Sequence, residues 1–243
     1  MNERLIVALD LNDLNKIKMI VEKLEGMVKY YKIGAIPFTY FGPEIIRFLK
    51  EKGFRVMLDL KYHDIPNTVA RACEGAMEMG VDMLTLHTSG GFSMLEEAVK
   101  AVSLISDVKK LPKTKLLGIT VLTSIDEAYF KDLFGDIKRS LREQVIMLAQ
   151  LAQSSGLDGV VASAQEIKVI RERCGKDFLI VTPGIRLEGE PVDDQARTMT
   201  AKEAIKAGAD YIVVGRPIIK AKDPLSAVQK IIEEIEDGLR EIV

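Results

Sequence analysis

The sequence predicts an α/β fold, a single (β/α)8 TIM barrel over residues 1–243, on the strength of three observations. Short apolar, β-rich runs recur eight times, and segments with helical periodicity separate them. The length of 243 residues is ordinary for such a barrel. Eight strand–helix repeats favour a closed barrel over a doubly wound sheet. Because no Pro/Gly/Ser-rich linker or low-complexity run divides the chain, we expect one domain.

The eight runs expected as strands are, in chain order, residues 5–9, 28–33, 54–60, 83–86, 115–121, 159–162, 178–181 and 211–214. Between them, apolar residues recur at helical spacing. One helical face is marked by Leu14, Ile17, Val21 and Leu24, and another by Leu225, Val228, Ile232, Ile235 and Leu239. A further helical pattern begins near Val69, and Asp13 is expected to cap the helix that starts at Leu14.

Composition narrows the possible partners. The net charge is −2, so no global basic field attracts nucleic acid or an acidic membrane. Tryptophan is absent and aromatic residues make up 6%, which leaves no evident stacking platform for single-stranded nucleic acid. No run approaches the roughly 20 apolar residues of a membrane span, and the N-terminal apolar run is too short for a signal peptide. We therefore expect a soluble, cytoplasmic protein.

The cysteines and histidines argue against a metal site. Cys73 and Cys174 are the only cysteines and do not form a C-x-x-C pair, which favours a reducing compartment and argues against structural zinc. Only two histidines are present, too few for most imidazole metal sites. We expect no metal.

Polar residues and two glycines lie at or just after the ends of the predicted strands, as expected for a barrel whose active site is at the carboxyl ends of its strands. In chain order they are Asp10, Lys32, Asp59, Lys61, His87, Thr123, Gly184, Arg186, Gly215 and Arg216. They are therefore expected to collect at one rim.

The stretch from Asp59 to Thr68 carries the strongest chemical signal. If residues 54–61 form a strand, Asp59 and Lys61 project to the same side, and Asp64 lies beyond the strand end. One ammonium group then lies within reach of at least one carboxylate. A solvated ion pair at a strand end is the alternative, but the apolar strand argues against a free surface.

The last two strand ends predict a phosphate site. Glycine at 215 lets backbone amides approach an anion, and the guanidinium of Arg216 can bind two phosphate oxygens. Gly184 and Arg186 supply the counterpart after the seventh strand. Alone, Arg216 could be a salt-bridged rim residue; with Gly184 and Arg186, phosphate binding is favoured. The polar residues 187–198 resemble a lid, or else an ordinary surface loop.

The string from Asp59 to Thr68 closely resembles the signature of the orotidine 5'-monophosphate decarboxylases, D-x-K-x-x-D-I-x-x-T after the third barrel strand, and fills every position. The resemblance implies conversion of orotidine 5'-monophosphate to uridine 5'-monophosphate and carbon dioxide, the last step of de novo UMP biosynthesis, without cofactor or metal. It implies that Lys61 stabilises and then protonates the C6 carbanion, that Asp59 and Asp64 keep Lys61 charged, and that Lys32 completes the charge array and touches the ribose.

The same resemblance assigns substrate contacts and a partner. Asp10 would bind ribose hydroxyls, Thr123 the amide edge of the pyrimidine, and Gln195 both base and phosphate. Further residues would reach across a homodimer interface into the neighbouring site, namely Asp64, Ile65 and Thr68. His87 is left out of the catalytic set, because a lone histidine at a strand end is more often structural.

Two rival functions stay open. A relative in the same barrel superfamily, such as 3-keto-L-gulonate 6-phosphate decarboxylase, shares D-x-K-x-x-D but stabilises an enediolate with magnesium. It would need an extra acidic ligand near the second or third strand, where this chain has the cation Lys32. A catalytically inactive nucleotide-binding sensor would lack a lysine or carboxylate of the charge array, and none is missing.

Overall fold

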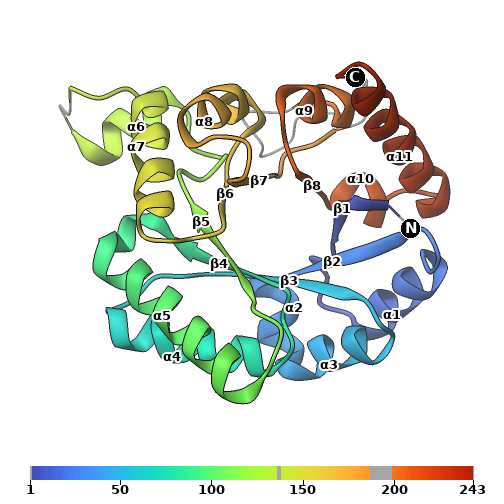
Figure 1. The fold of residues 1–243 in the computed structure, drawn as a ribbon. Helices are drawn as coiled ribbons and strands as arrows, with labels where there is room; N and C mark the ends of the chain where they lie inside the picture. Colours follow the sequence, from blue (N-terminus) through green and yellow to red (C-terminus); the bar gives the residue numbers. More distant parts are fainter. Residues whose placement is uncertain (1, 136–137, 187–198, 243) are drawn as a thin grey trace.

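The computed structural model describes residues 2–135, 138–186 and 199–242, and its centre is a closed barrel of eight parallel strands. Each strand pairs with the next along the chain, and β8 pairs with β1 (Figure 1). The strands are β1 (Asn2–Ala8), β2 (Val28–Gly34), β3 (Arg55–Tyr62), β4 (Met83–His87), β5 (Lys115–Ile119), β6 (Gly159–Val161), β7 (Leu179–Thr182) and β8 (Tyr211–Val214). The predicted (β/α)8 barrel is confirmed. Both ends of every observed strand lie within three residues of the predicted ends.

Helices form the outer ring around the strands (Figure 1). They are α1 (Leu14–Lys23), α2 (Ala35–Phe41), α3 (Pro43–Glu51), α4 (Pro66–Glu78), α5 (Gly91–Lys109), α6 (Glu127–Phe134), α7 (Leu141–Ser154), α8 (Ile167–Cys174), α9 (Ala201–Ala207), α10 (Arg216–Ile219) and α11 (Pro224–Arg240), with short 3-10 turns η1 (Thr88–Gly90) and η2 (Ala164–Glu166). None of the helices among the described residues is long and apolar enough to cross a membrane.

Helix starts follow local chemistry. Asp13 caps α1 as predicted, since its carboxylate accepts hydrogen bonds from the backbone amides of Asn15 and Lys16. The helical pattern expected from near Val69 corresponds to α4, which begins three residues earlier, at Pro66. Proline has no backbone N–H and a fixed φ, both of which suit the first helical turn.

The apolar residues form two layers, as alternation along barrel strands requires. The barrel interior is filled by Ile6, Ala8, Tyr30, Met57, Met83, Leu117, Val181 and Val213. A larger layer between the strands and the helices includes the outward-facing neighbours of these residues, for example Leu5, Val7 and Leu58. The interior is therefore a packed core, and a cavity can open only beyond its last layer.

Three aspartates secure the amino-terminal end of the barrel, away from the predicted site. Each aspartate lies just before β4, β6 or β8. Its carboxylate accepts a hydrogen bond from a backbone N–H of the preceding strand, β3, β5 or β7. Asp82 accepts from Val56 at 2.7 Å, and Asp158 and Asp210 accept from β5 and β7 at 2.8 Å each. These bonds satisfy strand-end amides that would otherwise lack a ladder partner.

Candidate active site

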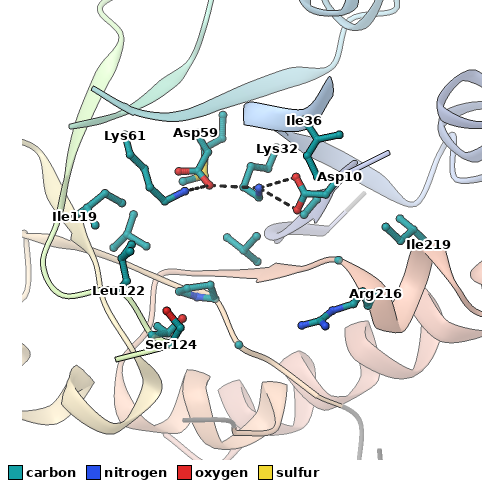
Figure 2. A pocket seen from close by; sticks show the side chains of 18 of the residues that line it. Asp10, Lys32, Ile36, Asp59, Lys61, Ile119, Leu122, Ser124, Arg216 and Ile219 are labelled. Atoms are coloured by element: carbon teal, nitrogen blue, oxygen red, sulfur yellow. Dashed lines mark hydrogen bonds and ion pairs between the residues drawn. The ribbon is translucent and has the colours of Figure 1, made fainter. Parts of the chain in front are cut away.

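A cavity of about 600 Å³ opens at the carboxyl ends of the strands, where the sequence predicts the site. Figure 2 shows charged side chains on two of its sides: four from the first three strands lie together, and Arg216 lies across the cavity from them. The cavity lining includes seven of the predicted binding residues, Asp10, Lys32, Asp59, Thr123, Arg186, Gly215 and Arg216, and also Lys61.

The charged residues reach the cavity because of strand alternation. Residues two apart in a strand point to the same face. Asp10 follows the interior residue Ala8 by two positions, Lys32 follows Tyr30, and Asp59 follows Met57. They therefore lie one step above the packed interior, where the barrel has room for a ligand.

Four of these side chains form an array of alternating charge, drawn with dashed lines in Figure 2. The Lys61 ammonium lies 2.9 Å from Oδ2 of Asp59, and the same oxygen lies 3.3 Å from the Lys32 ammonium. Lys32 also donates to both carboxylate oxygens of Asp10, at 3.1 and 3.2 Å. Each charge of the buried pair Lys32 and Asp59 has an opposite neighbour, which offsets the cost of removing it from water.

The array keeps its two buried members, Asp59 and Lys32, ionised. Burial raises the pKa of Asp59, but the ammonium groups of Lys32 and Lys61, together with the hydrogen bonds to the carboxylate, outweigh burial and hold it below its ordinary value. Burial lowers the pKa of Lys32, but Asp59 and Asp10 outweigh it and raise the pKa above its ordinary value. Asp59 is thus held as a carboxylate and Lys32 as an ammonium.

Gly34 makes room for the array at the end of β2. A Cβ atom at this position would lie 2.7 Å from Oδ1 of Asp10 and 3.0 Å from the Lys32 ammonium. The first distance is shorter than Cβ atoms show and the second is tight, so a larger residue would displace the ends of these two side chains. Glycine therefore leaves room for the array here, and it is not needed for backbone conformation, since its φ is −91°.

Lys61 has an unusual backbone. Its φ is +52°, a left-handed value that non-glycine residues seldom adopt. The ladder between β3 and β4 shifts register between Leu58 and Tyr62, so the regular alternation predicted through Lys61 does not hold there. The side chains of Asp59 and Lys61 nevertheless meet. The backbone N–H of Lys61 donates to Oγ1 of Thr85 at 2.9 Å.

The opposite side of the cavity offers two guanidinium groups. Arg216 follows β8 directly, after Gly215. Arg186 follows β7, and its Nη1 donates to its neighbour's carbonyl at 2.9 Å. The other terminal nitrogen of Arg186, Nη2, is buried and has no hydrogen-bond partner among the described residues. A buried donor without a partner is expensive, so it is well suited to an anionic ligand.

Three predicted residues lie outside the cavity of their own chain. Asp64, Ile65 and Thr68 are exposed, with 67% of Ile65 accessible. The Asp64 carboxylate accepts from the backbone N–H of Ile65 and forms no ion pair with Lys61 among the described residues. Gln195 and the proposed lid, residues 187–198, lie outside the described part of the chain.

His87 is half-buried at the end of β4, and its ring centre lies 5.3 Å from that of His63. Burial, aided by His63 and Lys61, lowers the pKa of His87 below its ordinary value. The imidazole is therefore kept neutral, and nothing in its geometry adds it to the charge array.

Sequence reasoning missed three residues of this region. Ser124 and Lys220 line the cavity, and Thr85 lies beneath it, fully buried. Thr85 follows the interior residue Met83 by two positions, so the inward-facing parity of its strand could have revealed it. The exposed residues Ser124 and Lys220 carry no comparable signal in the sequence.

A divalent metal ion does not fit the donor set. Among the described residues, no three His, Cys, Asp or Glu side chains form a group that could hold a metal ion. The carboxylates of Asp10 and Asp59 already face ammonium groups at 2.9–3.3 Å, and a cation there would meet two positive charges.

Comparison with known proteins identifies the family of the chain. The family model described as "Orotidine 5'-phosphate decarboxylase / HUMPS family" matches residues 3–231. The orotidine 5'-phosphate decarboxylase of Syntrophus aciditrophicus is 48% identical over 239 residues, which cover 98% of this chain and 94% of that protein. The protein of the same name from Dictyoglomus turgidum is 48% identical over 233 residues, 96% of this chain and 95% of that protein.

Solved structures give the same result. The crystal structure of orotidine 5'-phosphate decarboxylase from Lactobacillus acidophilus superposes with a TM-score of 0.83 at 36% identity, covering 96% of this chain and 99% of that one. Both the sequence and the fold thus match over nearly the full length. The chain belongs to the orotidine 5'-phosphate decarboxylase / HUMPS family.

Proposed function

We propose that this chain removes the C6 carboxylate of orotidine 5'-monophosphate, giving uridine 5'-monophosphate and carbon dioxide, and that Lys61 carries the reaction. The observation that supports the roles is the array Lys61–Asp59–Lys32–Asp10 at the mouth of the barrel. It lies in a chain whose 48% identical relatives are named orotidine 5'-phosphate decarboxylase. UMP biosynthesis is the process that this product serves.

The reaction is difficult because negative charge develops at C6 of the pyrimidine ring. Loss of carbon dioxide leaves an electron pair at C6 that the pyrimidine ring delocalises poorly. A fixed positive charge beside C6 stabilises this pair because it is oriented before the reaction begins. The Lys61 ammonium is held at 2.9 Å from Asp59, and it then gives its proton to C6 as general acid. Asp59, which its ammonium neighbours hold as a carboxylate, orients the Lys61 ammonium through their ion pair.

The remaining roles follow from position. Asp10 and Lys32 bind the ribose, and Thr123 faces the amide edge of the base. The phosphate is bound by Arg216, the backbone at Gly215, and Arg186, whose buried Nη2 lacks a partner among the described residues. Gln195 is proposed to link base and phosphate. Binding energy from the remote phosphate can then support the chemistry at C6.

We also propose a homodimer with shared sites. Asp64, Ile65 and Thr68 are exposed next to the cavity's own strand, and Asp64 forms no ion pair with Lys61 of its own chain among the described residues. In a dimer these residues would complete the partner's site, with Asp64 beside the partner's charge array. Activity should then fall on dilution below the dimer dissociation constant. A fully active monomer in sedimentation and kinetic assays would contradict the shared site.

Two further expectations remain proposals. Residues 1–243 are proposed to form one domain, since β1 and β8, from opposite ends of the chain, close the same barrel. A cytoplasmic location is proposed because both cysteines are free and buried, as is usual in reducing compartments.

A magnesium-dependent sugar-phosphate decarboxylase of the same barrel superfamily is the second candidate, since such enzymes share the D-x-K-x-x-D motif that this chain carries. The ammonium of Lys32 opposes it, because magnesium requires oxygen ligands that are free of cations. A chelator separates the two functions: EDTA should leave turnover of orotidine 5'-monophosphate unchanged. Loss of activity with EDTA and its recovery with magnesium would favour the rival.

The decisive experiment is to incubate the purified protein with orotidine 5'-monophosphate and follow the loss of orotate absorbance. The Lys61→Ala variant should lose almost all turnover and still bind uridine 5'-monophosphate, since its charge acts mainly in the transition state. Lys50→Ala is a matched control: it deletes an ammonium 2.7 Å from Asp82, at the other end of the barrel. Near wild-type turnover by Lys61→Ala would refute the assignment.

A further inference from the structure

The backbone of Lys61 is held in place by a side chain from the neighbouring strand. Three residues of β3, Asp59, Leu60 and Lys61, lie between the paired residues Leu58 and Tyr62. On β4, Leu58 pairs with Leu84 and Tyr62 pairs with Leu86, and only residue 85 lies between these two leucines. Two residues of β3 are therefore in excess at this point. A regular ladder cannot supply backbone acceptors for all the N–H groups of such a bulge.

Thr85 occupies the single opposing position. Its side chain is fully buried, and its hydroxyl makes two hydrogen bonds. The hydroxyl accepts the backbone N–H of Lys61 at 2.9 Å and donates to Oδ1 of Asp59 at 3.0 Å. The hydroxyl thus replaces the missing ladder acceptor and joins the lysine to the carboxylate that neighbours its ammonium.

The direction of both bonds is fixed by chemistry. A backbone N–H can only donate, so the Thr85 oxygen must accept from Lys61. A hydroxyl has one proton, which is then available only for Asp59. Oδ1 of Asp59 must accept, and Oδ2 is left for the two lysines, at 2.9 and 3.3 Å. The threonine therefore orients the carboxylate as well as the backbone.

The left-handed backbone makes this support necessary. With φ at +52°, Lys61 adopts a conformation that is unfavourable for a residue with a Cβ. Such a conformation persists only where the surroundings fix it. If the amide of Lys61 were released, the residue could relax toward extended backbone, and its side chain would leave the direction that brings the ammonium beside Asp59.

From this geometry we infer that Thr85 is a positioning residue for the decarboxylation. Its hydroxyl, at the β3–β4 bulge, keeps the Lys61 ammonium next to the Asp59 carboxylate. Thr85 does not line the cavity, so it would act through Lys61 and Asp59. The inference rests on the proposed function of Lys61. It adds a residue of β4 to a site whose other residues lie on or just after β1, β2, β3, β5, β7 and β8.

The test compares three variants of the full chain. Thr85→Val keeps the shape of the side chain and removes the hydroxyl. Thr85→Ser keeps the hydroxyl. Thr182→Val is the matched control, because Thr182 is also fully buried on a barrel strand, and its hydroxyl has no hydrogen-bond partner among the described residues. Each variant is measured for kcat and KM with orotidine 5'-monophosphate and for melting temperature.

Thr85→Val should lower kcat by about 10- to 100-fold, because displacement of a reacting group by about 1 Å can cost that much. Its KM should change by less than about threefold, since the groups proposed to bind the phosphate and ribose stay in place. Thr85→Ser should recover most of kcat, and Thr182→Val should match wild type. A crystal structure of Thr85→Val should show Lys61 outside the left-handed region.

The inference is overturned if Thr85→Val retains wild-type kcat, or if Thr85→Ser is as impaired as Thr85→Val. If Thr85→Val does not fold, Thr85→Ala takes its place with the same expectations. Wild-type protein that fails to decarboxylate orotidine 5'-monophosphate would instead refute the proposed function. The backbone of Lys61 in the variant crystal would still decide the role of Thr85.

Discussion

Gly34→Ala probes how closely the charge array is packed. The new Cβ would lie 2.7 Å from Oδ1 of Asp10 and 3.0 Å from the Lys32 ammonium, so the ends of these side chains must shift, and we expect the ion pair between them to lengthen. The backbone at Gly34, with φ −91° and ψ −171°, accepts alanine. Any effect must therefore come from the displaced side chains, and not from strain in the main chain.

The size of the effect follows from the geometry. The pair is 3.1 Å long, and lengthening it by about 1 Å costs about 1.3 kcal/mol at an effective dielectric constant of about 20. The Asp10 side chain is 40% exposed, so solvent screening reduces this cost to about 1 kcal/mol or less. At about 1.4 kcal/mol for a factor of ten, kcat/KM should fall about threefold to fivefold.

The assay is steady-state decarboxylation, with urea unfolding as a parallel measurement of stability. Gly75→Ala is the control, because Gly75 lies within α4 and a Cβ there meets no atom within 4 Å. Alanine at that position should stabilise the helix by up to about 1 kcal/mol and leave kinetics unchanged. Equal kinetics for Gly34→Ala and Gly75→Ala would refute the argument that Gly34 makes room for the array.

Three further predictions concern other groups. Arg216→Ala should raise KM and lower kcat for orotidine 5'-monophosphate, because phosphate binding energy is used in the transition state; an unchanged KM would remove Arg216 from the phosphate site. Burial raises the pKa of Cys73 to about 12, so a thiol reagent at pH 8 should modify it only after unfolding in urea, and rapid modification of the native protein would contradict this. The lowered pKa of Asp59 contributes to the free energy of unfolding. This contribution is fully present above the ordinary carboxyl pKa of about 4, and it is lost as pH falls through the lower pKa of the folded state. Urea titrations from pH 7 to 3 should therefore show a steeper loss of unfolding free energy for wild type than for Asp59→Asn, and parallel curves would argue against the shift.

The strands were predictable because their signal is local. Each of the eight runs is rich in apolar and β-branched residues and is separated from the next by a helical pattern. Asp10, Lys32 and Asp59 were predictable for a related reason: strand alternation and the geometry of the barrel decide where a residue just after an apolar run must point. The start of α4 at Pro66 was missed, although proline in a first helical turn is a recognisable sign.

The features that could not be predicted depend on contacts between distant segments. The left-handed backbone of Lys61 depends on a register shift against β4, whose residues lie more than 20 positions further along the chain. Thr85 looks like an ordinary threonine of a β-strand until its hydroxyl is seen between Lys61 and Asp59. The sequence alone likewise does not show that Gly34 leaves space for the Asp10 carboxylate and the Lys32 ammonium.

The mismatch between β3 and β4 also bears on protein design. A designer who grafts D-x-K onto the third strand of another barrel would copy the charges but not the two surplus residues, nor the hydroxyl opposite them. The transplanted lysine would sit in ordinary pleated backbone and point elsewhere. The smallest transferable unit of this chemistry is therefore a pair of adjacent strands with their staggered pairing, and not a string of sequence.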